Sequence, residues 1–121
     1  MDTTPARGEL GAMLGELRAE AVHRAESLDA SMAELRIDRS VDTADDEHDP
    51  EGVTLSTEWA RLAGLRQAAE RDLAEIDAAQ ARWDAGTYGI CIDCGRSIPI
   101  ARLRARPAAM RCVACAEKAG A

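Results

Sequence analysis

The chain has 121 residues, which fits one domain or one small module with an extension. It has no Phe, one Tyr and two Trp, and because large rings supply much of a compact core, a single globular core is not expected. The abundance of Ala, Leu, Arg and Glu is typical of long helices. The apolar runs are too short to span a bilayer, and no charged-then-apolar leader stands at the N-terminus. We therefore expect a cytoplasmic protein without a membrane partner.

Charge is distributed unevenly along the chain. The formal net charge is −7, but residues 1–90 carry −11 and residues 91–121 carry +4. The sequence therefore describes an acidic extension on a mildly basic module. DNA would repel so acidic a body, because DNA binding normally needs a basic face.

The first predicted element is a long helix from about residue 6 to about residue 40. Thr4 and Pro5 are a plausible N-cap and first helical residue. Steps of three and four residues, close to the 3.5-residue period of a coiled coil, then separate Leu10, Leu14, Leu17, Ala21, Ala25, Leu28, Met32 and Leu35. Three glycines in the first turns weaken this helix, each by roughly 1 kcal/mol relative to Ala.

Residues 41–53 interrupt this pattern, with Pro50 and Gly52 as turn residues. A second helix should begin near Thr54 or Ser56, either of which can cap it, and stop at Gly86. Its apolar face should consist of Leu55, Trp59, Leu62, Leu65, Ala69, Leu73, Ile76, Gln80 and Trp83, with Ala79 beside Gln80. Two helices of this length, each about 50 Å long, joined by one short connection must run antiparallel.

The predicted fold is therefore mainly α: a long antiparallel α-hairpin, packed as a coiled coil, on a small cysteine module. We assign residues 1–86 to the hairpin and residues 87–121 to the module. The connection, residues 42–52, is here called the acidic tip. Six of its residues from Asp42 to Glu51 are acidic. It does not match an EF-hand calcium loop, and a hairpin end offers no pocket for acid–base catalysis. A solvated loop is the default interpretation, although the tip is longer than a polar turn needs.

The four cysteines form two C-x-x-C pairs, Cys91 with Cys94 and Cys112 with Cys115, separated by seventeen residues. This spacing is typical of a tetrahedral metal centre, and a closed set of four thiolates is structural rather than catalytic. Gly95 suits the tight turn after the second thiolate, where a positive φ is often needed. We expect one structural Zn²⁺, with iron as an open alternative. Two disulfides would use the same residues, but nothing else suggests secretion.

The segment from Gly86 to Pro107, followed by Cys112 and Cys115, resembles the C4-zinc-finger region of the DksA/TraR family. The shared features are an aromatic residue and Gly before the first cysteine (Tyr88, Gly89), Cys-Gly at the second (Cys94, Gly95), and the stretch Arg102-Leu-Arg-Ala-Arg-Pro107. With the hairpin and the acidic tip, the resemblance covers roughly residues 10–118.

The resemblance implies a function. Family members are not enzymes: they bind RNA polymerase and insert the coiled coil through its secondary channel, which alters the stability of open promoter complexes. The family's tip motif is Asp-x-x-Asp-x-Ala. Asp46 and Asp49 supply both aspartates here, with Glu51 in place of Ala, and Asp42 and Asp45 repeat the spacing. The implied site residues at the tip are thus Asp42, Asp45, Asp46, Asp49 and Glu51.

The resemblance also bears on further contacts. Some members bind guanosine tetraphosphate (ppGpp), the alarmone of the stringent response, through several basic side chains. Ala68, Glu75 and Ala116 stand at three of the aligned positions, and only Arg106 matches, so we expect little or no dependence on ppGpp. Candidate contacts to the polymerase rim are Arg96, Arg102, Arg104 and Arg106. We expect a short C-terminal helix in place of the family's longer one.

Two alternatives come from other classes. The spacing of the four cysteines is also that of GATA-type fingers, which would make the protein a sequence-specific DNA-binding zinc finger. The charge of −11 on the hairpin argues against this alternative. The other alternative is a coiled-coil interaction protein whose hairpin opens into a dimer, whereas the secondary-channel interpretation implies a monomer.

Overall fold

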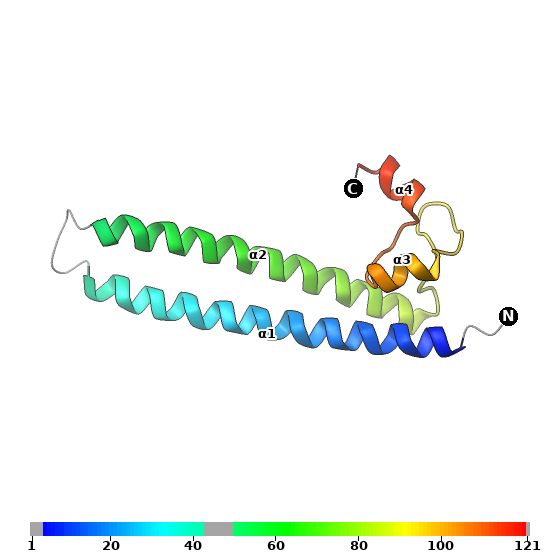
Figure 1. Cartoon of the computed structure of the whole chain (residues 1–121), viewed down its shortest axis with the longest axis horizontal. Coiled ribbons are helices and arrows are strands. Elements are labelled where there is room, and N and C mark those ends of the chain that lie inside the picture. The colour runs from blue at the N-terminus through cyan, green and yellow to red at the C-terminus, as the bar shows by residue number, and fades with distance from the viewer. Residues whose placement is uncertain (1–3, 43–49, 121) are drawn as a thin grey trace. The chain divides into compact units, whose positions relative to one another are not determined.

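The computed structural model describes the backbone of residues 4–42 and 50–120 and the side chains of residues 7–37 and 54–120. Over these ranges the chain forms two long helices, α1 (Thr4–Asp42) and α2 (Pro50–Ala85), and two short ones, α3 (Ile100–Ala105) and α4 (Val113–Lys118) (Figure 1). The predicted mainly α fold with two long helices is confirmed. Among the described helices, none has a stretch long and apolar enough to cross a membrane.

The helix bounds agree with the sequence except at one end. Helix α1 lies within about two residues of its predicted bounds, which is the usual uncertainty of a helix end. Helix α2, by contrast, begins at Pro50, so Thr54 and Ser56 lie inside the helix and do not cap it. Proline is compatible with a first helical position because the N–H group it lacks would have no partner within the helix there. The predicted start lies too late because Pro50 was interpreted as a turn residue.

The C-terminal end of α2 lies where the sequence predicted it. Gly86 follows Ala85 with φ 78°, a conformation that glycine adopts without steric cost. The N–H of Gly86 donates to the carbonyl of Trp83, and the N–H of Thr87 donates to the carbonyl of Arg82. These two bonds form a Schellman motif, which satisfies the last carbonyl groups of the helix. The motif ends α2 and changes the direction of the chain directly before the cysteine module.

Both long helices contribute to two compact units. Unit 1 consists of Met1–Ala19 and Leu73–Ala121, and unit 2 consists of Glu20–Asp72. The boundary expected from the sequence, between residues 86 and 87, falls inside unit 1. The assignment of domains stays a prediction, and each unit is described by itself below.

In unit 2 the two helical segments run antiparallel. Arg24 Nη1 lies 3.5 Å from Asp72 Oδ2, and further along α1 Asp29 Oδ1 accepts a hydrogen bond from Arg66 Nε at 2.8 Å. The guanidinium of Arg36 lies 5.4 Å from the ring centroid of Trp59, a cation–π geometry. Among the side chains of this unit that the structure describes, the buried apolar ones are Ala21, Ala25, Leu35, Leu62 and Ala69. Because most of these are small, the interface that they fill is thin.

One residue predicted for this interface lies outside it. The side chain of Leu65 is 43% exposed, and Arg66 is the more buried of the two residues. The interface positions of α2 alternate in steps of three and four residues. The step from Trp59 to Leu62 is three residues, so the next step is four residues and leads to Arg66. Its Nε binds Asp29, and its Nη1 lies 3.2 Å from Glu70 Oε1 without hydrogen-bond geometry. Leu65 was predicted there because it is apolar, but the helical period places it on the exposed side.

Unit 1 joins the ends of the long helices to the cysteine module through one hydrophobic cluster. Leu10 and Leu14 of α1 and Ala79 of α2 supply its helical part. The module supplies four more buried residues, namely Tyr88, Cys91, Ile98 and Leu103. Tyr88 O–H also donates a 2.8 Å hydrogen bond to the carbonyl of Pro107, and burial raises the pKa of this phenol. The module therefore does not rely on a core of its own.

Trp83 packs against this cluster, and its indole lies close to α1 at Gly11, where there is no side chain. A Cβ atom on Gly11 would lie 3.0 Å from Trp83 Cζ2 and 3.2 Å from Cη2, closer than ordinary van der Waals contact. The indole also contacts Tyr88, with ring centroids 5.2 Å apart and a tilt of 59°. Gly11 is therefore unfavourable for the helix but favourable for packing.

This arrangement predicts opposite effects for two glycines of α1. Gly15→Ala should raise the free energy of unfolding by roughly 0.5–1 kcal/mol, because alanine favours the helix and nothing lies within 4 Å of the new Cβ. Gly11→Ala has the same helical advantage but must displace the indole, and overpacking costs about 1–3 kcal/mol. Chemical denaturation of both variants would measure the difference. Equal stabilisation by both substitutions would contradict the close packing of Trp83 on α1.

Candidate metal centre

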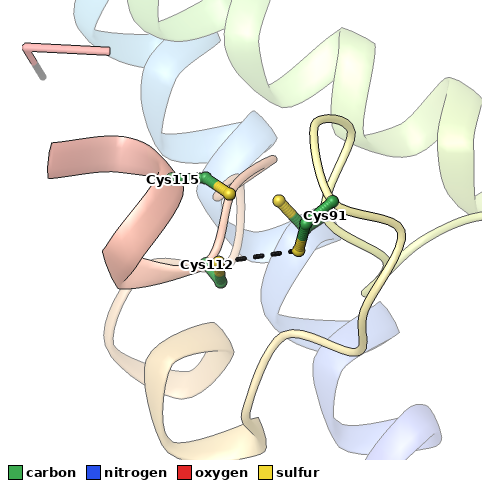
Figure 2. Close-up of side chains that lie close together, drawn as sticks. Cys91, Cys112 and Cys115 are labelled. Atoms are coloured by element: carbon green, nitrogen blue, oxygen red, sulfur yellow. Dashed lines mark hydrogen bonds between the residues drawn. The ribbon is translucent and has the colours of Figure 1, made fainter. Parts of the chain in front are cut away.

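The four cysteines come from two short segments of unit 1. Cys91 and Cys94 lie in the connection between α2 and α3, Cys112 is the N-cap residue of α4, and Cys115 lies in α4. Figure 2 shows the sulfur atoms of Cys91, Cys112 and Cys115 on facing segments, turned toward a common space. The structure thus brings together residues from two separate stretches of the sequence.

The first pair is held by a tight turn. The N–H of Gly95 donates to the carbonyl of Cys91 at 3.0 Å, and the N–H of Cys91 donates to the carbonyl of Arg96 at 2.8 Å. Gly95 has φ 72°, as predicted from the Cys-Gly sequence. An isolated antiparallel bridge between Ile90 and Ser97 closes the base of this turn. The backbone therefore returns on itself around the two sulfurs.

The second pair uses the first turn of a helix. The N–H of Ala116 donates to the carbonyl of Cys112 at 2.9 Å, which begins the hydrogen bonding of α4. Residues three apart lie on the same face of a helix, so Cys112 and Cys115 present their sulfurs on one side. Helix α4 thus gives the second C-x-x-C spacing its geometry.

The spacing of the sulfurs fits a tetrahedral zinc ion. All four Sγ atoms lie within 4.8 Å of one another, and Cys94 Sγ lies 3.9 Å from Cys112 Sγ. A tetrahedron with Zn–S bonds of about 2.3 Å has edges of about 3.8 Å. A disulfide would need about 2.0 Å, and all four cysteines are free. The structure therefore supports one four-cysteine zinc site and not the alternative of two disulfides.

The pKa values of the thiol groups show how strongly the four sulfurs interact. Hydrogen bonds from the backbone of Cys94 and then Cys112 lower the pKa of Cys91 to about 6. Hydrogen bonds with the side chains of Cys112 and Cys91 raise the pKa of Cys115 to about 12. One sulfur thus ionises readily, whereas another does not, because neighbouring thiols share protons. A bound Zn²⁺ deprotonates its thiol ligands outright and removes this conflict.

Residues around the cysteines tie the site to the rest of unit 1. Cys91 is 1% exposed and belongs to the cluster of Leu10 and Leu14. Arg82 of α2 reaches the carbonyl of Ala108 with its Nη2 at 3.4 Å, and burial lowers the pKa of this guanidinium.

A further contact links the segments of the two cysteine pairs. Asp93, which lies between the two cysteines of the first pair, accepts a 2.6 Å hydrogen bond from Arg111 Nε. Neither Arg82 nor the Asp93–Arg111 pair was predicted from the sequence, because no spacing rule links these positions.

The four arginines predicted as rim contacts have different surroundings. Arg96 and Arg106 are exposed. Arg104 is about half exposed and pairs with Glu9 of α1 at 3.1 Å, whereas Arg102 Nε donates to the carbonyl of Arg111 at 2.8 Å. Arg102 therefore supports the fold of the module itself. The tip residues Asp42, Asp45, Asp46, Asp49 and Glu51 have side chains that lie outside the described residues.

Comparison with known proteins agrees with this geometry. Residues 86–119 match the family model of the prokaryotic dksA/traR C4-type zinc finger. An uncharacterized protein of Aquifex aeolicus (strain VF5) is 50% identical over 46 residues, which are 38% of this chain. The match spans only about a third (32%) of that relative's own length. The sequence likeness is therefore local.

The fold itself is shared over nearly the whole chain. It resembles the structure of transcription factor DksA2 from Pseudomonas aeruginosa with a TM-score of 0.80, covering 96% of this chain and 84% of that one, at 22% identity. The predicted resemblance to the DksA/TraR family is confirmed in its zinc finger and in its fold. The structural cofactor of this finger is one zinc ion.

The site predicts one zinc ion per chain. Metal analysis of the purified protein should find equimolar zinc and protein, with little iron. Cys94→Ser should lose most of this zinc to a competing chelator, because three thiolates leave the tetrahedron open. Ser97→Ala, close in sequence to the first pair, should retain the metal as the wild type does. Full zinc retention by Cys94→Ser would show that the four sulfurs do not act as one site.

Proposed function

We propose that this protein is a transcription regulator that binds RNA polymerase. It inserts its acidic tip, residues 42–52, into the secondary channel through which nucleotides reach the catalytic centre. There it alters the stability of open promoter complexes. The protein acts as a cytoplasmic monomer, and the proposal is of a regulator and not of an enzyme.

The observation that carries the proposal is the combination of fold and finger. A likeness to transcription factor DksA2 covers 96% of the chain, and residues 86–119 match the dksA/traR zinc finger. The alternative of a GATA-like DNA-binding protein rests on cysteine spacing alone and does not account for two long helices. An acidic hairpin is also unsuited to the DNA backbone.

Helical hairpins suit insertion into a channel. A pre-formed helical hairpin loses little conformational entropy on binding, so binding energy is not spent on ordering it. Carboxylates of the acidic tip would act electrostatically on Mg²⁺ or basic groups inside a confined site, where screening by water is weak. In this proposal Asp46 and Asp49 are the working residues, with Asp42, Asp45 and Glu51 adding negative charge.

The zinc module provides the second contact in this proposal. Arg96 and Arg106 are the better candidates for the polymerase rim because they are exposed. Arg104 has to exchange its pairing with Glu9, and Arg102 its bond to the carbonyl of Arg111, before either can bind a partner. Because Ala68, Glu75 and Ala116 offer no cation, we also expect ppGpp to change the effect of the protein little.

The proposal predicts that binding and effect can be separated at the tip. Asp46→Asn combined with Asp49→Asn should leave capture of RNA polymerase in a pull-down largely intact. The same variant should lose the change in promoter-complex lifetime that the wild type produces, because the tip no longer carries its central charges. A filter-binding or transcription assay on preformed open complexes measures that lifetime, with and without ppGpp.

A matched control removes two charges elsewhere on the hairpin. Glu26 and Glu34 are exposed acids of α1 with described side chains, and Glu26→Gln with Glu34→Gln should behave as the wild type in both assays. If the wild type neither captures polymerase nor alters complex lifetime, the proposed function is wrong. If the tip variant retains the full effect, Asp46 and Asp49 are not the working residues.

A further inference from the structure

One side-chain ion pair directly connects the two cysteine pairs. Asp93 lies between Cys91 and Cys94, and Arg111 immediately precedes Cys112. Arg111 Nε donates to Asp93 Oδ2 at 2.6 Å, a short charge-assisted hydrogen bond. The two groups are 18 residues apart in sequence. The contact therefore joins the two halves of the metal site without using a ligand atom.

The backbone on both sides of this contact is fixed as well. The N–H of Ile92 donates to the carbonyl of Met110 at 3.0 Å, directly beside the ion pair. The carbonyl of Arg111 accepts the 2.8 Å hydrogen bond from Arg102 Nε. Arg111 is thus held at its main chain by α3 and at its side chain by Asp93. Contacts that use no metal ligand therefore position its guanidinium.

A second ion pair in the same unit shows how this one differs from an ordinary surface pair. Arg104 and Glu9 are 53% and 47% exposed and 3.1 Å apart, and pairs of this kind contribute little because water screens them. Asp93 is 44% exposed, much like Glu9, but Arg111 is only 25% exposed and its 2.6 Å bond to Asp93 is shorter. The Arg104–Glu9 pair also joins α3 to α1 and does not connect the cysteines. The Arg104–Glu9 pair therefore serves as a control: it is an ion pair of the same unit that does not connect the two cysteine pairs.

We propose that Asp93 and Arg111 form a positioning pair that keeps zinc in the site by holding the second cysteine pair against the first. Zinc leaves a site of four thiolates in steps, as the thiolates detach one at a time. Seventeen residues, including α3, separate the second cysteine pair from the first, and bringing the two ends of such a segment together costs entropy. A contact that keeps the two ends together raises the effective concentration of the detached thiolates and favours their return. This inference is independent of polymerase binding.

The test is a double-mutant cycle on zinc release. Asp93→Asn keeps the shape of the side chain without its charge, and Arg111→Met keeps much of its length. Transfer of zinc to an excess of chromogenic chelator should be about tenfold faster in each variant, the lower end of the usual effect of residues around a metal site. In the double variant it should be no faster than in the single ones, because they remove the same contact.

Four further measurements separate positioning from general loss of structure. The Co²⁺-loaded variants should keep the absorption bands of a tetrahedral tetrathiolate site, and the zinc-loaded variants should keep wild-type helicity. Arg111→Lys retains the positive charge, so its rate of zinc release should be close to that of the wild type. Glu9→Gln, which removes the control pair, should leave the release rate unchanged.

Zinc release at the wild-type rate in both single variants would overturn the proposal. Additive acceleration in the double variant would also overturn it, because Asp93 and Arg111 would then act independently. A comparable acceleration in Glu9→Gln would show that any loss of charge in unit 1 loosens the metal, and the specific role of this pair would be wrong.

Discussion

The structure of unit 1 depends on the burial of one metal ligand in a core that the long helices help to build. Cys91 is 1% exposed and packs in the same cluster as Leu10 and Leu14 of α1. A module of about 35 residues cannot bury enough surface to fold alone, and structural zinc sites supply folding free energy directly. Here the metal and the helix ends share that task. The zinc site and the base of the hairpin should therefore be stable together or not at all.

The same constraint explains how a chain with no Phe can fold. Two of its three large aromatic residues, Trp83 and Tyr88, lie beside each other at this cluster. Unit 2 buries mostly alanine and leucine, so its helices approach closely and little core volume has to be filled. Exposed ion pairs such as Arg24 with Asp72 add little stability each. By pairing opposite charges along antiparallel segments, they favour the observed register over shifted ones.

Local patterns predicted the backbone well, and contacts between distant residues were harder to predict. Helical period, C-x-x-C spacing and the glycines after α2 and Cys94 indicated both long helices and the metal site, because each depends on neighbouring residues. Leu65 was expected in the interface because it is apolar, although the helical period places it outside. Pro50 was expected in a turn, but a proline can also stand at the start of a helix. The fit of Trp83 onto Gly11 and the pairing of Asp93 with Arg111 depend on tertiary packing, so no sequence pattern indicates them.

Hydrogen exchange with and without zinc tests the shared stability of unit 1 most directly. We predict that removing zinc accelerates amide exchange in the cysteine module, and equally in residues 8–19 of α1 and 73–85 of α2. Exchange in residues 21–37 and 54–72, which belong to unit 2, should change far less. If zinc removal accelerated exchange in the cysteine module alone, the metal site and the helix ends would be independent, and their shared stability would be contradicted.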